Sequence, residues 1–250
     1  MAPGGVEARA DMDCELRVAE SICHLSKVSA IGYQLFSIMS GILITFEGGD
    51  ASGKSTQVAR LAKRLKAAGK TVTMVHDPGT TEVGQAIRQL LLHSRESDRL
   101  NDKAELLLFA ASRSQLISEI IRPALAAGSI VVSDRFADST TVYQGYARGL
   151  DQAFIRALET FLLGEIRPTL TFVLDLDLAT MRKRQLRRVR PVTETDRLEL
   201  LPDEFHQRVR AGYLQLAGRE PERIRMIDAS LPENEIEEII WKEWNALPSR

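Results

Sequence analysis

Apolar residues form two kinds of pattern along most of the chain, short continuous runs and longer segments with helical periodicity, and the two kinds alternate. Short runs rich in β-branched and aromatic residues predict buried strands, and longer segments with helical periodicity lie between them. The expected strands are 42–46, 71–75, 130–133, 170–174 and 224–227. The expected helices are 54–68, 81–93, 102–127 (long enough for a kink before Pro123), 151–163, 178–190, 202–217 and 233–245.

Strands that alternate with helices indicate an α/β fold. Each strand–helix–strand unit favours a right-handed crossover, so we expect a parallel sheet of about five strands with helices on both faces. In such a three-layer fold, ligands bind beyond the carboxyl ends of the strands.

Residues 1–38 show neither of these patterns. Acidic residues such as Glu7, Asp11 and Glu20 argue against a targeting signal in this segment. Met39-Ser40-Gly41 directly precedes the first expected strand. We therefore expect a loosely ordered extension over 1–38 and a folded domain over 39–250. The alternative is that Met39 is the natural start, which the intact mass of the natively expressed protein would decide.

The composition is that of one globular domain. Hydrophobic residues make up 44% of the 250 residues, enough for a full core. The 33 Lys and Arg residues nearly balance 34 Asp and Glu residues, which gives no general attraction to nucleic acid or to acidic membranes. No apolar run is long enough to span a membrane. The two cysteines, Cys14 and Cys23, provide no disulfide framework for the domain, so we expect a cytoplasmic protein.

One segment matches a phosphate-binding motif at every position. The motif is G-x-x-x-x-G-K-[ST], and the segment is Gly48-Gly49-Asp50-Ala51-Ser52-Gly53-Lys54-Ser55, with Thr56 next in the expected ATP site. A strand precedes it and a helix follows it, so backbone N–H groups and the positive end of the helix would face the phosphates. Lys54 should reach the β- and γ-phosphates, and the Ser55 hydroxyl should ligate Mg²⁺. The motif predicts a P-loop NTPase fold that binds a nucleoside triphosphate.

Size and missing motifs narrow the class further. The Asn-Lys-x-Asp motif of GTPases does not occur, and the chain is too short for a large ATPase. A small-molecule kinase remains. Asp134-Arg135 follows the third expected strand, where ligands should lie. Asp134 is suited to hold Mg²⁺ through water, and Arg135 to bridge the donor and acceptor phosphates. A surface ion pair at a turn is the structural alternative.

Five stretches make residues 41–230 resemble the thymidylate kinase family. They are Phe46–Asp50, Asp77–Thr81 with Ile87-Arg88, Leu107–Arg113, Asp134–Ser139 with Tyr143–Gly145 and Arg148-Gly149, and Leu174–Leu176 with the arginine-rich stretch that ends in Asp196-Arg197. The fourth is the most specific, because its tyrosine and glutamine keep a fixed spacing from the Asp-Arg pair. The resemblance implies an ATP- and Mg²⁺-dependent kinase that converts dTMP to dTDP and forms a homodimer through helices.

The resemblance also implies roles for four residues around the acceptor base. Phe109 would stack on thymine, and Arg113, one helical turn later, would donate to a thymine carbonyl. Gln144 would read the base edge, and Tyr143 would close the sugar pocket. The structural alternatives are core packing for Phe109, a solvated helix face for Arg113, and ordinary loop positions for Tyr143 and Gln144.

Other residues would act on the phosphate side of the acceptor. Arg135 and Arg88 would hold the monophosphate, Asp50 would orient the acceptor side of the site, and Ser139 belongs to the same expected pocket. Family members carry an arginine before the Pro-Gly of the second stretch, and that arginine helps to bind the acceptor phosphate. His76 is the nearest equivalent here, which weakens the transfer of that role. The bond before Pro78 is a candidate for the cis form.

Six basic residues crowd nine positions after the fourth strand. They are Arg182, Lys183, Arg184, Arg187, Arg188 and Arg190. Beside a P-loop, this cluster indicates a mobile basic lid over about 182–197. Such a lid would exclude water and bring a cation to the transferred phosphoryl group. Some family members place an arginine inside the P-loop, where this chain has Ala51, so it resembles the subgroup whose lid supplies the charge. We expect Arg184 to contact adenine and Arg188 to contact the transferred phosphate, and a solvated basic surface is the alternative.

Three competing functions stay open at this point. One is a kinase for another nucleoside monophosphate or for a deoxynucleoside. The second is a nucleotide-binding regulator that does not catalyse. The third is nucleic-acid binding through the arginine cluster, which the lack of interleaved aromatic residues and the balanced net charge disfavour.

Overall fold

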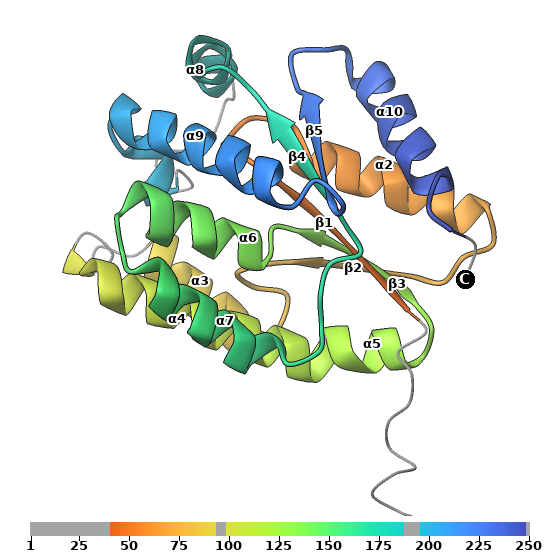
Figure 1. Cartoon of the computed structure of the whole chain (residues 1–250), viewed down its shortest axis with the longest axis horizontal. Coiled ribbons are helices and arrows are strands. Elements are labelled where there is room, and N and C mark those ends of the chain that lie inside the picture. The colour runs from red at the N-terminus through yellow and green to blue at the C-terminus, as the bar shows by residue number, and fades with distance from the viewer. Residues whose placement is uncertain (1–40, 94–98, 188–195, 249–250) are drawn as a thin grey trace, which may run out of the picture. The chain divides into compact units, whose positions relative to one another are not determined.

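The computed structural model describes residues 41–93, 99–187 and 196–248, so the expected extension over 1–38 lies outside the described residues. Its sheet has five parallel strands in the order β2-β3-β1-β4-β5 (Figure 1). The strands are β1 Ile42–Gly48, β2 Val72–His76, β3 Ile130–Asp134, β4 Leu170–Asp175 and β5 Ile224–Asp228. The five expected strands and their parallel pairing are therefore confirmed.

Helices α2 to α9 lie between successive strands, α10 follows the last strand, and three of these helices begin with a side-chain cap. The helices are α2 Lys54–Ala67, α3 Glu82–Leu92, α4 Asp102–Leu116, α5 Arg122–Ala126, α6 Ala137–Thr140, α7 Gln152–Leu163, α8 Leu178–Arg187, α9 Asp203–Arg219 and α10 Glu233–Asn245. The side chains of Thr81, Asn101 and Asp151 accept hydrogen bonds from the first-turn N–H groups of α3, α4 and α7. Each cap satisfies a backbone donor that the helix itself leaves unpaired.

Two segments differ from the sequence expectation. The long helix expected over 102–127 consists of α4 and α5 joined by a π-helical turn, Ile117–Ile121. Pro123 stands in the first turn of α5, where its missing N–H costs no hydrogen bond. Residues 137–147, for which no element was expected, form α6 and a second π-helical turn, Thr141–Ala147. Packing stabilises this turn, because Val142 and Tyr143 are buried against α9.

The sheet divides the hydrophobic core into two layers. On one face, Ile44 and Phe46 of β1 pack with Leu61 of α2 and Ile240 of α10. On the other face, α4, α5, α7 and α9 cover the strands (Figure 1). The intervening β1 residues Thr45 and Glu47 are also buried, although they are polar. In the part of the chain that the structure describes, no helix has the length and apolar character needed to cross a membrane.

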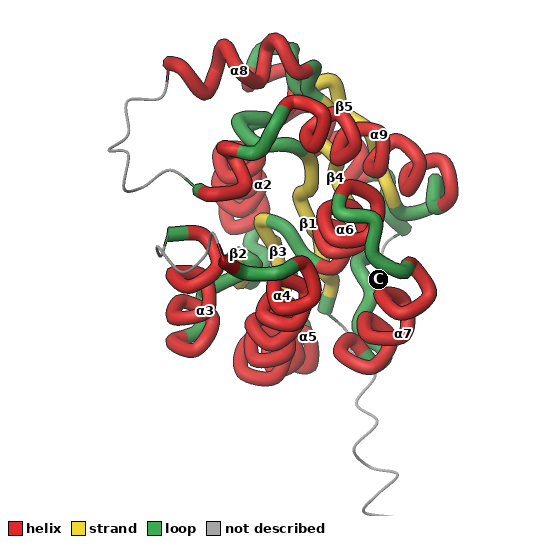
Figure 2. The backbone as a smooth tube through the Cα atoms, turned by 90° about the vertical axis from the view of Figure 1, so that its left-hand side faces the viewer, coloured by secondary structure: helices red, strands yellow, loops and turns green. Residues whose placement is uncertain are grey.

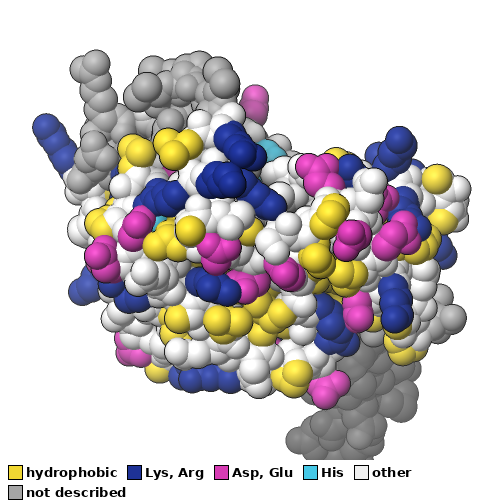
Figure 3. Space-filling view, turned by 90° about the horizontal axis from the view of Figure 1, so that it is seen from above, with side chains coloured by type: hydrophobic (Ala, Val, Ile, Leu, Met, Phe, Trp, Pro, Cys, Tyr) yellow, Lys and Arg dark blue, Asp and Glu magenta, His cyan; other side chains and the backbone are white. Residues whose placement is uncertain are grey.

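The carboxyl ends of β2, β3 and β1, which are neighbours in the sheet, lie together at one edge. In the strand register, Phe46 of β1 pairs with Asp134 of β3, and Asp134 also pairs with His76 of β2. Figure 2 shows this edge with α3 and α4 on one side and α8 on the other. The face shown in Figure 3 carries basic and acidic side chains interspersed, with several basic side chains near its centre.

Candidate active site

The P-loop joins β1 to α2 and takes the strained backbone that a phosphate cradle requires. Gly48 and Gly53 have φ angles of 128° and 93°, and Ala51 has a φ of 57°. A Cβ on Gly48 would lie 2.4 Å from the carbonyl oxygen of Leu174, so only glycine fits there. The chain therefore turns tightly at the end of the central strand and directs the first N–H groups of α2 into the loop.

Lys54 folds back over this loop. Its Nζ donates to the carbonyl oxygens of Gly49 at 2.7 Å and Gly48 at 3.2 Å. Burial, together with the positive charge of Arg135, lowers the pKa of Lys54 to about 8, while Asp134 and Asp50 oppose the shift. These oxygens and the Ser52 hydroxyl at 3.5 Å are all uncharged acceptors, so the ammonium gains a stronger partner when a phosphate enters, which suits the predicted role of Lys54.

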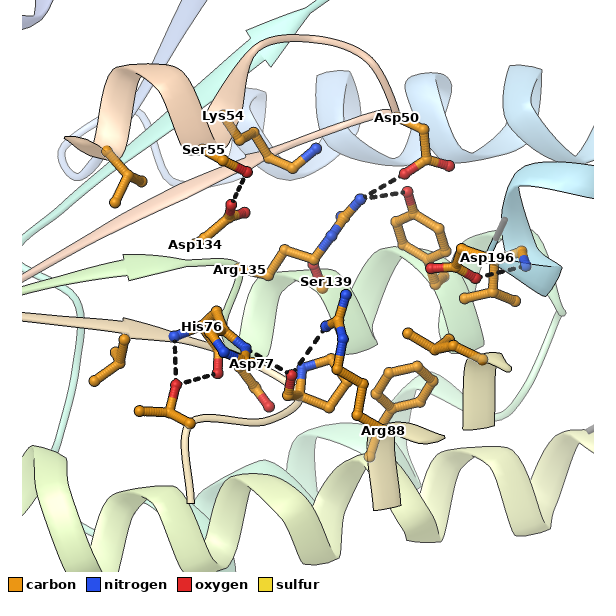
Figure 4. Close-up of a pocket in the computed structure, with 18 of the residues that line it drawn as sticks. Asp50, Lys54, Ser55, His76, Asp77, Arg88, Asp134, Arg135, Ser139 and Asp196 are labelled. Atoms are coloured by element: carbon orange, nitrogen blue, oxygen red, sulfur yellow. Dashed lines mark hydrogen bonds and ion pairs between the residues drawn. The ribbon is translucent and has the colours of Figure 1, made fainter. Parts of the chain in front are cut away.

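Ser55 and Asp134 bring two oxygen ligands to the mouth of the P-loop. The Ser55 hydroxyl donates to Asp134 Oδ2 at 2.5 Å, across the start of α2 and the end of β3 (Figure 4). A hydroxyl and a carboxylate are ligands that Mg²⁺ accepts, and this ion commonly completes its shell with water and substrate phosphates. No group of three or more His, Cys, Asp or Glu side chains that could hold a metal ion occurs among the described residues.

Arg135 links the P-loop to the acceptor side of the site. Its Nη2 donates to Asp50 Oδ1 at 2.9 Å and to the Tyr143 hydroxyl at 3.3 Å, and its guanidinium lies 5.1 Å from the centre of the Tyr143 ring. Nη1 donates to Ser139 Oγ at 3.3 Å. A left-handed φ of 68° turns the residue inward (Figure 4). The alternative of a surface pair between Asp134 and Arg135 is wrong, because each of the two has a different partner in the site.

A buried glutamate, Glu47, to which sequence reasoning assigned no role, supports the segment that follows Arg135. Glu47 Oε1 accepts the Phe136 backbone N–H at 2.8 Å, and Oε2 accepts the hydroxyls of Ser139 and Tyr213 at 2.6 and 2.7 Å. Complete burial, followed by the charge of Asp138, raises the pKa of Glu47 to about 7. In the sequence, Glu47 stood at the end of an apolar strand and within the Phe46–Asp50 stretch of the resemblance, but neither feature indicated its partners.

The turn between β2 and α3 forms the wall opposite the P-loop. The Asp77–Pro78 bond is cis, as the sequence suggested, and Gly79 has a φ of 126°. His76 Nδ1 lies 3.0 Å from the Pro78 carbonyl oxygen, and Arg88 Nη1 donates to the same oxygen at 3.0 Å. Burial lowers the pKa of Arg88. His76 and Arg88 thus both line the wall on which the acceptor phosphate was expected (Figure 4).

The cleft between this wall and the P-loop is also lined by the four residues that were expected around the acceptor base. Phe109 is buried next to Tyr143, so it serves the core and the cleft together. Arg113 is only 2% exposed, with its Nε bonded to Asp77 Oδ2 at 2.5 Å and its Nη2 bonded to the Phe136 carbonyl oxygen at 3.2 Å. A solvated helix face for Arg113 is therefore wrong. Tyr143 and Gln144 are buried in the π-helical turn, so ordinary loop positions are also wrong.

Behind these residues lies a second acid that sequence reasoning missed. Glu105 of α4 accepts hydrogen bonds from Gln144, Arg148 and Arg197. Beside Arg197, Asp196 lines the cleft, and burial and the charge of Asp50 raise its pKa to about 6. Arg148 and Arg197 lie in stretches that carried the resemblance, but nothing in the sequence indicated their common partner.

The described part of the expected lid lies beside the P-loop. Arg184 Nη2 donates to the Ala229 carbonyl oxygen at 2.8 Å, and Nη1 donates to the Ala51 carbonyl oxygen at 3.4 Å. Arg182 pairs with Asp203 at 2.6 Å and is therefore bound to α9. Arg188 lies outside the described residues, and its expected contact with the transferred phosphate stays a prediction.

One cleft of about 600 Å³ unites the two halves of the site. The predicted residues that line it are Asp50, Ala51, Gly53, Lys54, Ser55, Thr56, Arg88, Phe109, Arg113, Asp134, Arg135, Ser139, Tyr143 and Gln144. Gly48 and Gly49 border a smaller hollow behind the P-loop, and Ser52 is buried within the loop. The parallel sheet, the phosphate cradle on its central strand and the adjoining cleft define a P-loop nucleotide-binding protein.

Comparison with known proteins identifies the family. The sequence profile described as "Thymidylate kinase" matches residues 46–240. A thymidylate kinase of Deinococcus radiodurans is 44% identical over 201 residues, covering 80% of this chain and 95% of the relative, and one of Chlorobium luteolum is 46% identical over 209 residues, covering 82% and 97%. The crystal structure of thymidylate kinase from Ehrlichia chaffeensis superposes with a TM-score of 0.66 at 32% identity, covering 82% of this chain and 98% of that one. The chain belongs to the thymidylate kinase family.

Proposed function

We propose that this chain transfers the γ-phosphoryl group of ATP to dTMP and produces dTDP. The observation that carries the proposal is the position of Arg135, whose guanidinium bonds to Asp50 in the phosphate cradle and to Tyr143 in the acceptor pocket. A planar cation between two phosphate subsites is suited to stabilise the charge that passes from one to the other. Family membership supports both the donor and the acceptor.

On the donor side, the residues bind and neutralise the triphosphate. Lys54 exchanges its bonds to the Gly48 and Gly49 carbonyl oxygens for bonds to the β- and γ-phosphates. Ser55 and Asp134 would hold Mg²⁺, Asp134 through water, and the bound ion would neutralise charge on the same phosphates. Arg184 stands beside Ala51, close enough to the loop to border the adenine of ATP.

On the acceptor side, the residues orient dTMP. Phe109 offers a ring for stacking on thymine. Arg113 spends two of its five N–H groups on Asp77 and Phe136, which leaves others for a thymine carbonyl. The acceptor oxygen belongs to a phosphate that is already ionised at neutral pH, so we assign no general base. Catalysis then comes from positioning and charge neutralisation.

The lid and the assembly extend the proposal. We assign the basic segment over about 182–197 to a lid that closes on ATP, with Arg188 at the transferred phosphate.

We also propose a cytoplasmic homodimer that associates through α4 and α7, which pack together. Leu107, Phe154 and Phe161 on these helices are 55%, 54% and 84% exposed, an apolar surface that a second copy would cover. Light scattering of wild type and Phe161→Glu tests this: a wild-type monomer would contradict it.

A coupled ADP-release assay with ATP and Mg²⁺ tests the reaction. The acceptors are dTMP, dUMP, UMP, CMP and thymidine, and Lys54→Met protein serves as the control for contaminating kinases. Turnover strongest with dTMP is the expected result. A different preferred monophosphate would refute the acceptor assignment, and turnover with thymidine but not with dTMP would indicate a nucleoside kinase. ATP binding without turnover of any acceptor would favour the regulatory alternative.

A further inference from the structure

Glu105 of α4 lies directly behind the amide that faces the acceptor base. It is 1% exposed, and its two carboxylate oxygens receive four N–H donors. Oε1 accepts from Gln144 Nε2 at 2.9 Å and from Arg148 Nε at 3.2 Å. Oε2 accepts from Arg148 Nη2 at 2.9 Å and from Arg197 Nη2. The carboxylate is thus held at both oxygens by three residues from two separate segments, the turn that carries Gln144 and Arg148 and the turn that begins at Arg197.

The surroundings keep Glu105 ionised. Burial alone would raise its pKa, but the hydrogen bond from Gln144, the charge of Arg148 and the hydrogen bond from Arg197 outweigh burial and lower the pKa. An ionised carboxylate accepts hydrogen bonds and donates none. Gln144 must therefore turn its NH₂ group toward Glu105. Because the amide has only two ends and the residue lines the cleft, its carbonyl oxygen is the end left for a ligand.

We propose that Glu105 is a positioning residue that sets base specificity by fixing the orientation of the Gln144 amide. An acceptor oxygen in the cleft pairs with the N3–H of thymine or uracil, whereas cytosine would place the N3 lone pair against it. The site therefore accepts pyrimidine monophosphates that carry a hydrogen on N3 and rejects those that do not. This inference rests on the proposed function, since it requires a pyrimidine nucleotide between Phe109 and Gln144.

The variant Glu105→Gln should reverse the orientation of the Gln144 amide, because glutamine has nearly the same shape as glutamate but carries a donor in place of one acceptor. Two charged donors, from Arg148 and Arg197, meet at the Oε2 position, so the amide oxygen of the new glutamine stays there. Its NH₂ group then occupies the Oε1 position, where it gives up only the longer 3.2 Å bond from Arg148 Nε and faces Gln144. Gln144 must present its own carbonyl oxygen to that NH₂, which rotates the NH₂ of Gln144 into the cleft. The edge offered to the base changes from acceptor to donor.

The readout is the ratio of kcat/KM for dUMP to kcat/KM for dCMP, because these substrates differ only at positions 3 and 4 of the base. Where turnover is too slow, inhibition constants against dTMP replace kcat/KM. We expect the ratio to fall by at least about 10-fold in Glu105→Gln, the size expected for a mispaired buried polar group. Glu105→Asp, which still only accepts, should keep a ratio above 1. A merely structural role for Glu105 would lower both rates in parallel.

A double-mutant cycle with Gln144→Met tests whether Glu105 acts on base specificity through Gln144. Removal of the amide should lower the dUMP-to-dCMP ratio, and Glu105→Gln should change it no further in that background. If wild type prefers dTMP but the ratio is the same in Glu105→Gln, the proposed function stands and this inference is overturned. If wild type turns over no pyrimidine monophosphate, both are overturned. Should Glu105→Gln not fold, an unchanged ratio in Gln144→Met overturns the inference alone.

Discussion

The carboxyl group of Glu47 makes the stability of the fold depend on pH in an unusual direction. Burial, followed by the charge of Asp138, raises its pKa from 4.5 to about 7. Between these values the unfolded chain releases a proton that the folded protein keeps. The unfolded state then binds fewer protons, so the free energy of unfolding falls as the pH rises through this window. The shift corresponds to a loss of about 3 kcal/mol, which is absent below pH 4.5 and complete above pH 7.

Glu47→Gln removes the titration while keeping the shape of the side chain. We therefore expect the difference in unfolding free energy between wild type and Glu47→Gln to change by about 3 kcal/mol from pH 4.5 to pH 7, in the direction that favours the variant at higher pH. Urea unfolding at a series of pH values and one protein concentration measures it. Burial also raises the pKa of Glu159 to about 7, but this residue titrates in both proteins and cancels. Parallel stability curves would refute the reasoning and show that Glu47 is ionised in the folded protein.

Three further predictions concern the phosphate cradle. Lys54→Met should lower kcat by at least about 100-fold without a matching loss of thermal stability, measured by ADP release and by circular dichroism. Asp134→Asn should raise the Mg²⁺ concentration for half-maximal activity by about 10-fold, measured by Mg²⁺ titration. Gly48→Ala should lower stability by more than about 3 kcal/mol, because its Cβ would lie 2.4 Å from the Leu174 carbonyl oxygen. Its control, Gly218→Ala in α9, meets nothing within 4 Å and should be neutral or stabilising.

Each of these has a contrary result. Retained kcat in Lys54→Met would place the triphosphate elsewhere, and an unchanged Mg²⁺ requirement in Asp134→Asn would remove that residue from the metal site. Equal melting temperatures for the two glycine variants would mean that the turn after β1 adapts to a side chain.

The sheet and the phosphate cradle were readable from the sequence because both are local patterns. A buried parallel strand appears as a short apolar run, and the P-loop is a contiguous motif whose strand and helix flank it. Residues 137–147 were not readable as a helix, because tertiary packing against α9 stabilises their irregular turn. The resemblance to a family placed Tyr143 and Gln144 in the site even so.

The two buried acids show where sequence reasoning stops. Glu47 and Glu105 each sit in an apolar segment, and their partners are distant in the chain: Ser139 and Tyr213 for one, Arg148 and Arg197 for the other. Only the folded arrangement brings these groups together, so neither acid could be given a role from its neighbours in sequence. The contacts of the lid beyond Arg187 remain predictions.

The strand order also determines when the site can exist during synthesis. The strand β1, which carries the P-loop, pairs Ile42 with Ile130 of β3 and Ile44 with Leu170 of β4. A nascent chain therefore extrudes its phosphate-binding strand long before either neighbour is available, and both edges of an apolar strand stay open in the meantime. The cradle therefore cannot be completed until β3 and β4, which lie in the second half of the chain, have been synthesised.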